Sequence, residues 1–126
     1  MTASPETVGL AGLAAAAAAD KLAADIVAFD VSEQLGIADV FLLCSGNTDR
    51  QVRAIVAAVE ERLREPAGRP VRREGEREGR WVLLDYVDLV VHVMAAEDRA
   101  YYSLERLWKD CPTVPLPEPA PVGTDA

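Results

Sequence analysis

Two residues of this chain, Cys44 and the single histidine His92, are of the types that form a nucleophile and its base. An imidazole beside a thiol can activate that thiol for covalent chemistry. No third side chain that would orient the imidazole is evident, and two residues alone are a weak pattern. We therefore interpret Cys44 as a small buried thiol and His92 as a strand-edge histidine.

Four aspartates lie near the ends of expected strands, where a metal-dependent enzyme gathers its carboxylates: Asp30, Asp39, Asp85 and Asp88. A nucleotidyltransferase pairs a Gly-Ser turn at a helix start with two acids, one residue apart, on the following strand. The segment CSGN resembles that turn only faintly, and Asp85 and Asp88 have the wrong spacing. Ordinary strand-end and turn positions explain these aspartates better, and an active nucleotidyltransferase is the alternative.

The segment SGNTDRQ, residues 45–51, ends a strand and starts a helix, and a phosphate could bind at such a helix N-terminus. It lacks the several glycines and the lysine of a phosphate-binding loop, so a helix cap is the better interpretation. Cys44 and Cys111 form no CxxC pair, and one histidine cannot complete a usual zinc set. The sequence predicts no metal and no cofactor, and its cysteines fit a reducing, cytoplasmic compartment.

The length and the net charge of the chain argue against some classes of function. A chain of 126 residues suits one domain, and its net charge of −8 argues against general binding of nucleic acid or of anionic membranes. An acidic chain can still bind a basic protein. Residues 7–24 are rich in alanine but follow no basic segment, so we expect a helix there rather than a signal peptide, and no apolar run reaches the roughly 18 residues of a membrane span.

The periodicity of apolar residues predicts three helices and five strands. Thr48 and Gln51 fit a capping box before a helix whose apolar stripe is Val52, Ile55, Val56, Val59 and Leu63. The expected helices are 7–24, 48 to about 65, and 97–110; the expected strands are 25–32, 38–45, 71–73, and two within 79–93 that turn at 86–88. This order predicts a single-domain α/β (α+β) fold with a mixed five-stranded sheet packed against helices. We place the domain at residues 1–111, followed by a proline-rich disordered tail at 112–126.

The strand that begins at Arg80 has two unlike faces. Because side chains alternate along a strand, Trp81, Leu83 and Asp85 point one way while Val82, Leu84 and Tyr86 point the other. The second set can fill a core beneath the helices. If helices cover only one side of the sheet, Trp81 and Leu83 are exposed and have the composition of an interface. If helices cover both sides, Trp81 is simply buried, and the sequence leaves both arrangements open.

Three segments together carry a family resemblance: FLLCSGNTDRQVRAIVAAVEERL (41–63), REGEREGRWVLLDYVDLVVHVM (73–94) and RAYYSLERLWKD (99–110). They resemble the ribosomal silencing factor (RsfS, or Iojap) family over residues 14–112. The family pattern combines an SGN-like turn, an RQV helix, a W-x-x-L-D-Y hairpin and a Y-x-L-E-x-L-W helix. This chain departs from the pattern at Val87, a position that is commonly glycine in the family.

The resemblance implies a non-catalytic protein with a nucleotidyltransferase-like fold that lacks the catalytic acids. Family members bind ribosomal protein uL-fourteen on the large subunit, block joining of the small subunit, repress translation, and are associated with large-subunit biogenesis; free members are often homodimers. The implied anchors are Trp81 and Leu83, and the implied polar contacts are Asp85 and Tyr86. Weaker candidates for partner contact are Arg80, His92, Arg99, Tyr101 and Tyr102.

Overall fold

The computed structural model describes residues 3–34, 36, 38–102, 106 and 108–116. Its elements are α1 (Pro5–Asp20), β1 (Ala24–Asp30), β2 (Val40–Gly46), α2 (Asp49–Ala67), β3 (Arg72–Glu74), β4 (Trp81–Asp85), β5 (Leu89–Ala95) and α3 (Ala96–Tyr102). All eight predicted elements are present. The predicted last helix, 97–110, ends too late, because residues 108–110 form a turn; residue 106 is helical, and residues 103–105 and 107 lie outside the described part.

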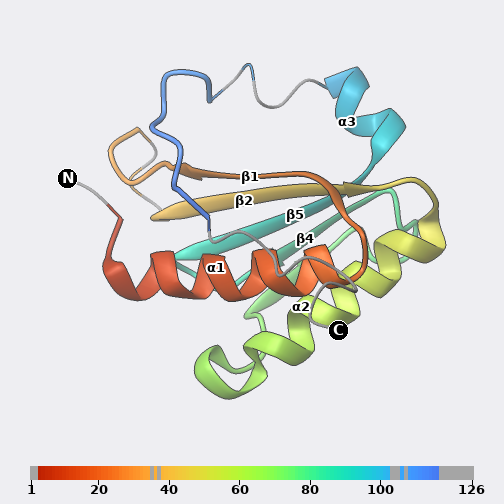
Figure 1. Cartoon of the computed structure of the whole chain (residues 1–126), viewed down its shortest axis with the longest axis horizontal. Helices are drawn as coiled ribbons and strands as arrows, with labels where there is room; N and C mark the ends of the chain where they lie inside the picture. Colours follow the sequence, from red (N-terminus) through yellow and green to blue (C-terminus); the bar gives the residue numbers. More distant parts are fainter. Residues whose placement is uncertain (1–2, 35, 37, 103–105, 107, 117–126) are drawn as a thin grey trace, which may run out of the picture.

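The strands form one mixed five-stranded sheet in the order β1-β2-β5-β4-β3, which confirms the predicted fold class. Strands β2 and β5 are parallel, and the other neighbours are antiparallel. Figure 1 shows α1 and α2 side by side on one side of the sheet, which we call the helix face, and α3 on the other side, which we call the second face. The two faces therefore differ in how fully they are covered.

Local signals in the sequence explain where α2 begins. The Thr48 hydroxyl caps the helix by accepting a hydrogen bond from the Gln51 N–H at 3.1 Å. The Gln51 side chain accepts a bond from the Asn47 N–H at 2.7 Å and donates to the carbonyls of Lys21 and Leu22 at 3.0 Å. Gln51 thus ties the end of α1 to the start of α2, which goes beyond the predicted capping box.

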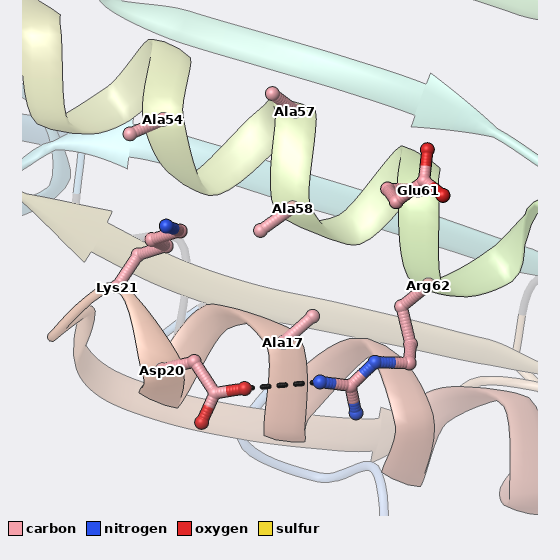
Figure 2. Close-up of a pocket in the computed structure, with 8 residues that line it drawn as sticks. All are labelled: Ala17, Asp20, Lys21, Ala54, Ala57, Ala58, Glu61 and Arg62. Atoms are coloured by element: carbon pink, nitrogen blue, oxygen red, sulfur yellow. Dashed lines mark hydrogen bonds and ion pairs between the residues drawn. The ribbon is translucent and has the colours of Figure 1, made fainter.

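Alanine lets α1 and α2 lie close together on the helix face. The outer groove between them is lined by Ala17 of α1 and by Ala54, Ala57 and Ala58 of α2 (Figure 2). An ion pair of 2.9 Å between Arg62 and Asp20 crosses the groove at one end. Small side chains keep the two helix backbones near each other, so the alanine-rich sequence of α1 serves packing.

The β4–β5 hairpin turns at Tyr86-Val87-Asp88, as the sequence predicts. The Asp88 N–H donates to the Tyr86 carbonyl at 3.0 Å, and the Val87 φ angle is +76°, which together describe a tight γ-turn. The Asp85 carboxylate supports the turn by accepting a hydrogen bond from the Val87 N–H at 2.8 Å. A β-branched residue at positive φ is strained, so the turn stores unfavourable energy.

Replacing Val87 with glycine is expected to raise the free energy of unfolding by about 1 kcal/mol. Relief of strain is worth about 1–3 kcal/mol, and the greater entropy of unfolded glycine offsets about 0.4–1 kcal/mol of it. Chemical denaturation measures the difference. Val71→Gly is the control, because Val71 is also exposed but has no positive φ, and this change is expected to destabilise the chain. An equal decrease in the free energy of unfolding in both variants would show that Val87 is not strained.

Residues 112–114 lie beside β1, at the outer edge of the sheet, where Thr113 is bridged to Phe29 (Figure 1). The Asp30 N–H donates to the Pro112 carbonyl, and the Val114 N–H donates to the Ala28 carbonyl, both at 2.8 Å. Val114 is buried and Leu116 packs against the core of the helix face. Residues 112–116 therefore depart from the predicted disordered tail, because apolar side chains between the prolines give this segment a surface to bury. Residues 117–126 lie outside the described part.

Ending the chain after Cys111 is expected to lower the free energy of unfolding by about 1–2 kcal/mol. The truncation removes the buried Val114 side chain and two backbone hydrogen bonds, and it exposes the edge of β1. A chain that ends after Leu116 is the control, because it keeps Val114 and both hydrogen bonds to β1. Urea denaturation compares the three. Equal stability of all three would show that residues 112–116 contribute nothing.

Candidate functional site

The two faces of β4 are separated as the sequence predicts. Val82 and Leu84 are buried in the cluster beneath α1 and α2. Trp81, Leu83 and Asp85 lie on the second face and are only partly buried. The arrangement with Trp81 fully buried under helices is therefore excluded. The indole and the neighbouring leucine are left partly accessible at the surface.

The loop before β4 fixes the position of Trp81. Gly75 has a φ angle of +78°, and a Cβ there would lie 1.9 Å from the Trp81 carbonyl oxygen, so only glycine fits. Arg53 of α2 holds the same loop by donating to the carbonyls of Glu76 and Arg77 at 3.0 and 2.9 Å. The charge-dense loop before β4 thus fixes where β4 begins and where Trp81 lies.

Aromatic rings cover the part of the second face that lies over β1 and β2. Trp108 contacts Phe41 edge to face, with ring centroids 4.9 Å apart, and Phe29 at 6.1 Å. Cys111 is buried in the same cluster. Trp108 thus packs against the core of the second face. Trp108 also lies beside His92 of β5, with ring centroids 5.8 Å apart.

His92 lies at the centre of the second face and is 5% exposed. Its Nδ1 accepts a hydrogen bond from the Trp81 Nε1–H at 3.2 Å, which places the imidazole proton on Nε2 because the indole only donates. Among the described residues, Nε2 has no hydrogen-bond partner. Burial lowers the pKa of His92 to about 4, so the ring is neutral at physiological pH.

A hollow of about 370 Å³ opens on the second face beside His92. Its apolar wall includes Phe41, Leu83 and Val90. Its charged wall is Asp85 together with Arg72 of β3, whose Nη2 lies 3.6 Å from the Asp85 Oδ2. A mostly apolar depression with one carboxylate suits a side chain with an apolar body and a polar end.

Two of the remaining candidates, Arg80 and Arg99, lie at or in the first turns of α3. Arg80 pairs with Asp98 at 2.7 Å and with Glu97 at 3.6 Å, at the start of α3. These carboxylates raise the pKa of the Arg80 guanidinium, and the hydrogen bond that Arg80 donates to Asp98 is the largest cause. Arg99 is buried, so its role includes packing. The side chains of Tyr101 and Tyr102 lie outside the described part of the chain.

Tyr86 lies apart from the other candidates. It packs against the core of the helix face, and its hydroxyl has no hydrogen-bond partner among the described residues. Burial raises the pKa of Tyr86 to about 12, and Glu60 adds to the shift. The alternation of side chains along β4 predicts this orientation. Tyr86 and Trp81 therefore lie on opposite faces of the sheet, and the structure does not bring these two candidates together.

Cys44 and His92 cannot act as a nucleophile and its base. His92 is the register partner of Leu43, so the Cys44 side chain points to the opposite face of the sheet. Burial raises the pKa of the Cys44 thiol to about 12, which disfavours the reactive thiolate. The interpretation of Cys44 as a buried thiol is confirmed, but His92 is a central residue and not a strand-edge residue, because β5 lies inside the sheet.

The four aspartates lie at one end of the sheet, and the SGN turn lies at the other. Asp39 donates its N–H to the Asp88 carbonyl at 2.8 Å, near the start of β2 and β5. Gly46 pairs with Ala95 at the far end of the same two parallel strands. The SGN turn and the aspartates of the alternative nucleotidyltransferase site therefore lie at opposite ends of the strands, too far apart to form one site.

Local backbone groups occupy two of these carboxylates. Asp30 accepts hydrogen bonds from the Ala3 N–H at 2.8 Å and from Ser32, and Asp39 accepts one from the Ser4 N–H at 3.0 Å. Burial alone would raise the pKa of Asp30, but these hydrogen bonds outweigh it and lower the pKa. Within the described residues, no three His, Cys, Asp or Glu side chains are placed to hold a metal ion. Both carboxylates anchor the chain ahead of α1.

Sequence reasoning missed five residues that line the hollow: Ala38, Phe41, Arg72, Val87 and Val90. Phe41 and Val90 belong to near-continuous apolar strands, in which no alternation separates one face from the other. Arg72 lies in a segment of mixed charge, and only the register of β3 against β4 shows that it opposes Asp85. A hydrophobicity pattern cannot supply that register.

In the described part of the chain, no helix is long and apolar enough to cross a bilayer.

Comparisons with known proteins agree on one family. A silencing factor RsfS of Bacillus subtilis is 45% identical over 104 residues, which are 82% of this chain and 88% of the relative. The mouse protein named mitochondrial assembly of ribosomal large subunit protein 1 is 30% identical over 68% of this chain and 39% of its own length. A crystal structure of a Chromobacterium violaceum protein superposes with a TM-score of 0.78 at 32% identity, covering 92% of each chain. Residues 3–125 match the family described as "ribosomal silencing factor during starvation", and the chain belongs to that family.

Proposed function

We propose that this protein binds the large ribosomal subunit through ribosomal protein uL-fourteen, blocks joining of the small subunit and so represses translation. The single observation that carries the proposal is the accessible strip of Trp81 and Leu83 on the second face, in a chain of this family. A partly exposed tryptophan beside leucine and a carboxylate has the composition of an interaction hot spot. The mechanism is steric and involves no catalytic step.

The charge of the chain supports a basic partner. A net charge of −8 attracts the positively charged proteins of the ribosome and speeds encounter with them. Asp85 stands next to the apolar strip and supplies a local negative charge. We propose that Trp81 and Leu83 are the apolar anchors of the interface and that Asp85 is its polar contact. Arg80, His92 and Arg99 are proposed to lie at the margin of this interface or beneath it.

Three further proposals follow from membership of the family. We propose that the protein acts in the cytoplasm, where ribosomal subunits join, and that the free protein forms a homodimer. We also propose a part in large-subunit biogenesis, which the name of the mouse relative supports. Sedimentation equilibrium would show a mass of about 27 kDa for the dimer, twice the 13.6 kDa chain.

Sedimentation with isolated large subunits tests the proposed function. The purified protein is expected to co-sediment with large subunits, and its addition is expected to reduce the fraction of joined ribosomes when small subunits are supplied. Isolated small subunits serve as the control and should carry no protein down. Absence of co-sedimentation at micromolar concentration would overturn the proposal while leaving the fold unaffected.

A further inference from the structure

Arg72 and Asp85 face each other across two neighbouring strands at the edge of the hollow. They are direct register partners in the antiparallel β3–β4 pair, and the Arg72 Nη2 lies 3.6 Å from the Asp85 Oδ2. The other carboxylate oxygen, Oδ1, accepts the hydrogen bond from the Val87 N–H at 2.8 Å. The carboxylate therefore has one oxygen fixed by the turn and one oxygen occupied by Arg72.

The contact between Arg72 and Asp85 is weak. The Arg72 side chain is 62% exposed, and 3.6 Å is longer than a charge-assisted hydrogen bond. Arg72 has a second anion within reach, because its Nε lies 3.2 Å from the Glu74 Oε2. Since Glu74 would still hold the guanidinium, Arg72 can leave Asp85 without losing every ionic partner.

The Asp85 side chain is only 22% exposed and forms one wall of the hollow, beside Phe41, Leu83 and Val90. A lysine or arginine entering the hollow would lay its aliphatic stem on the apolar wall and bring its charged end to Asp85. The excess negative charge of the chain favours such a cation over an anion. The site that this cation would use is the one that Arg72 holds.

Resting on the proposed binding to the ribosome, we infer that Arg72 is an internal competitor for Asp85. In the free chain Arg72 occupies the carboxylate, and a basic side chain of the ribosomal partner must displace it to enter the hollow. Arg72 thereby lowers the affinity of the second face for its partner. It also makes the hollow selective, because only a cation that enters together with the apolar contacts can compete with it.

Arg72→Gln is expected to bind large subunits about two- to fivefold more tightly than the wild-type chain, because the exposed ion pair no longer has to be broken. Arg73→Gln is the matched control. Arg73 is the next residue on the same strand and its loss changes the net charge equally, but it pairs with Glu60 of α2, on the helix face. We expect Arg73→Gln to leave the affinity within about 1.5-fold of wild type.

A double-mutant cycle with Asp85→Asn separates the release of the Asp85 carboxylate from the long-range effect of net charge on binding. Asp85→Asn is expected to weaken binding, and adding Arg72→Gln to it should give no gain, because no carboxylate remains to be released. Equal tightening by Arg72→Gln and Arg73→Gln would overturn the inference in favour of long-range charge. Weaker binding by Arg72→Gln would overturn it by showing that Arg72 itself contacts the partner.

The wild-type measurement distinguishes this inference from the proposed function. If wild-type protein does not bind large subunits, the proposed function fails and the inference falls with it. If wild-type protein binds and Arg72→Gln binds no more tightly, the inference alone fails. Thermal unfolding of each variant checks that it remains folded under the conditions of the binding measurement.

Discussion

Trp81→Ala is expected to weaken binding to the large subunit by about 2 kcal/mol or more, which is about 30-fold in the dissociation constant. The indole is the largest side chain on the accessible part of β4, and truncating it removes the central apolar contact of the proposed interface. It also removes the hydrogen bond to the His92 Nδ1. Quantitative co-sedimentation at constant salt measures the change.

The variant should remain folded. Trp81 is only partly buried, so we expect its loss to cost about 1–2 kcal/mol of a typical folding stability of 5–15 kcal/mol. Tyr86→Ala is the matched control, because Tyr86 is a partly buried aromatic residue on the opposite face of the same hairpin. It should lower stability similarly and leave binding unchanged. Unfolding of Trp81→Ala, or equal loss of binding in both variants, would contradict the assignment of the second face.

Much of the fold follows from local signals. The Thr48 cap, the apolar stripe of α2 and the alternation along β4 are set by residues close in sequence, so they predict α2 and both faces of the hairpin correctly. The hollow depends on distant segments, because β2 and β5 supply its apolar wall and β3 supplies Arg72. No local pattern fixes which strands become neighbours. The ordered course of residues 112–116 was missed for the same reason, since it depends on the free edge of β1.

His92 shows why the type of a residue does not fix its role. In sequence it is the only imidazole and therefore a candidate base. In the structure it is a neutral core residue whose Nδ1 holds the Trp81 indole in place. Protonation would convert this acceptor into a donor and would place a charge among Phe41, Trp81 and Trp108. The charged groups of the same hollow, Arg72 and Asp85, pair with each other.

The protein is therefore expected to lose about 3 kcal/mol of folding stability between pH 7.5 and pH 4 through His92 alone. The pKa is about 4 in the folded chain and about 6.5 in the unfolded chain, so the unfolded chain binds more protons between these values. The contribution is complete above pH 6.5, falls as the pH drops towards 4, and changes no further below that. Urea denaturation across this range measures the loss.

His92→Gln separates this effect from the titration of carboxylates, which both proteins share. The glutamine oxygen can still accept the hydrogen bond from the Trp81 indole, but the side chain binds no proton in this range. The difference in unfolding free energy between the two proteins should therefore change by about 3 kcal/mol from pH 7.5 to pH 4. Because His92 is the only histidine, its imidazole NMR signal is unambiguous and should titrate near pH 4. Parallel stability curves, or a midpoint near 6.5, would show that the imidazole is in contact with water and that burial does not lower its pKa.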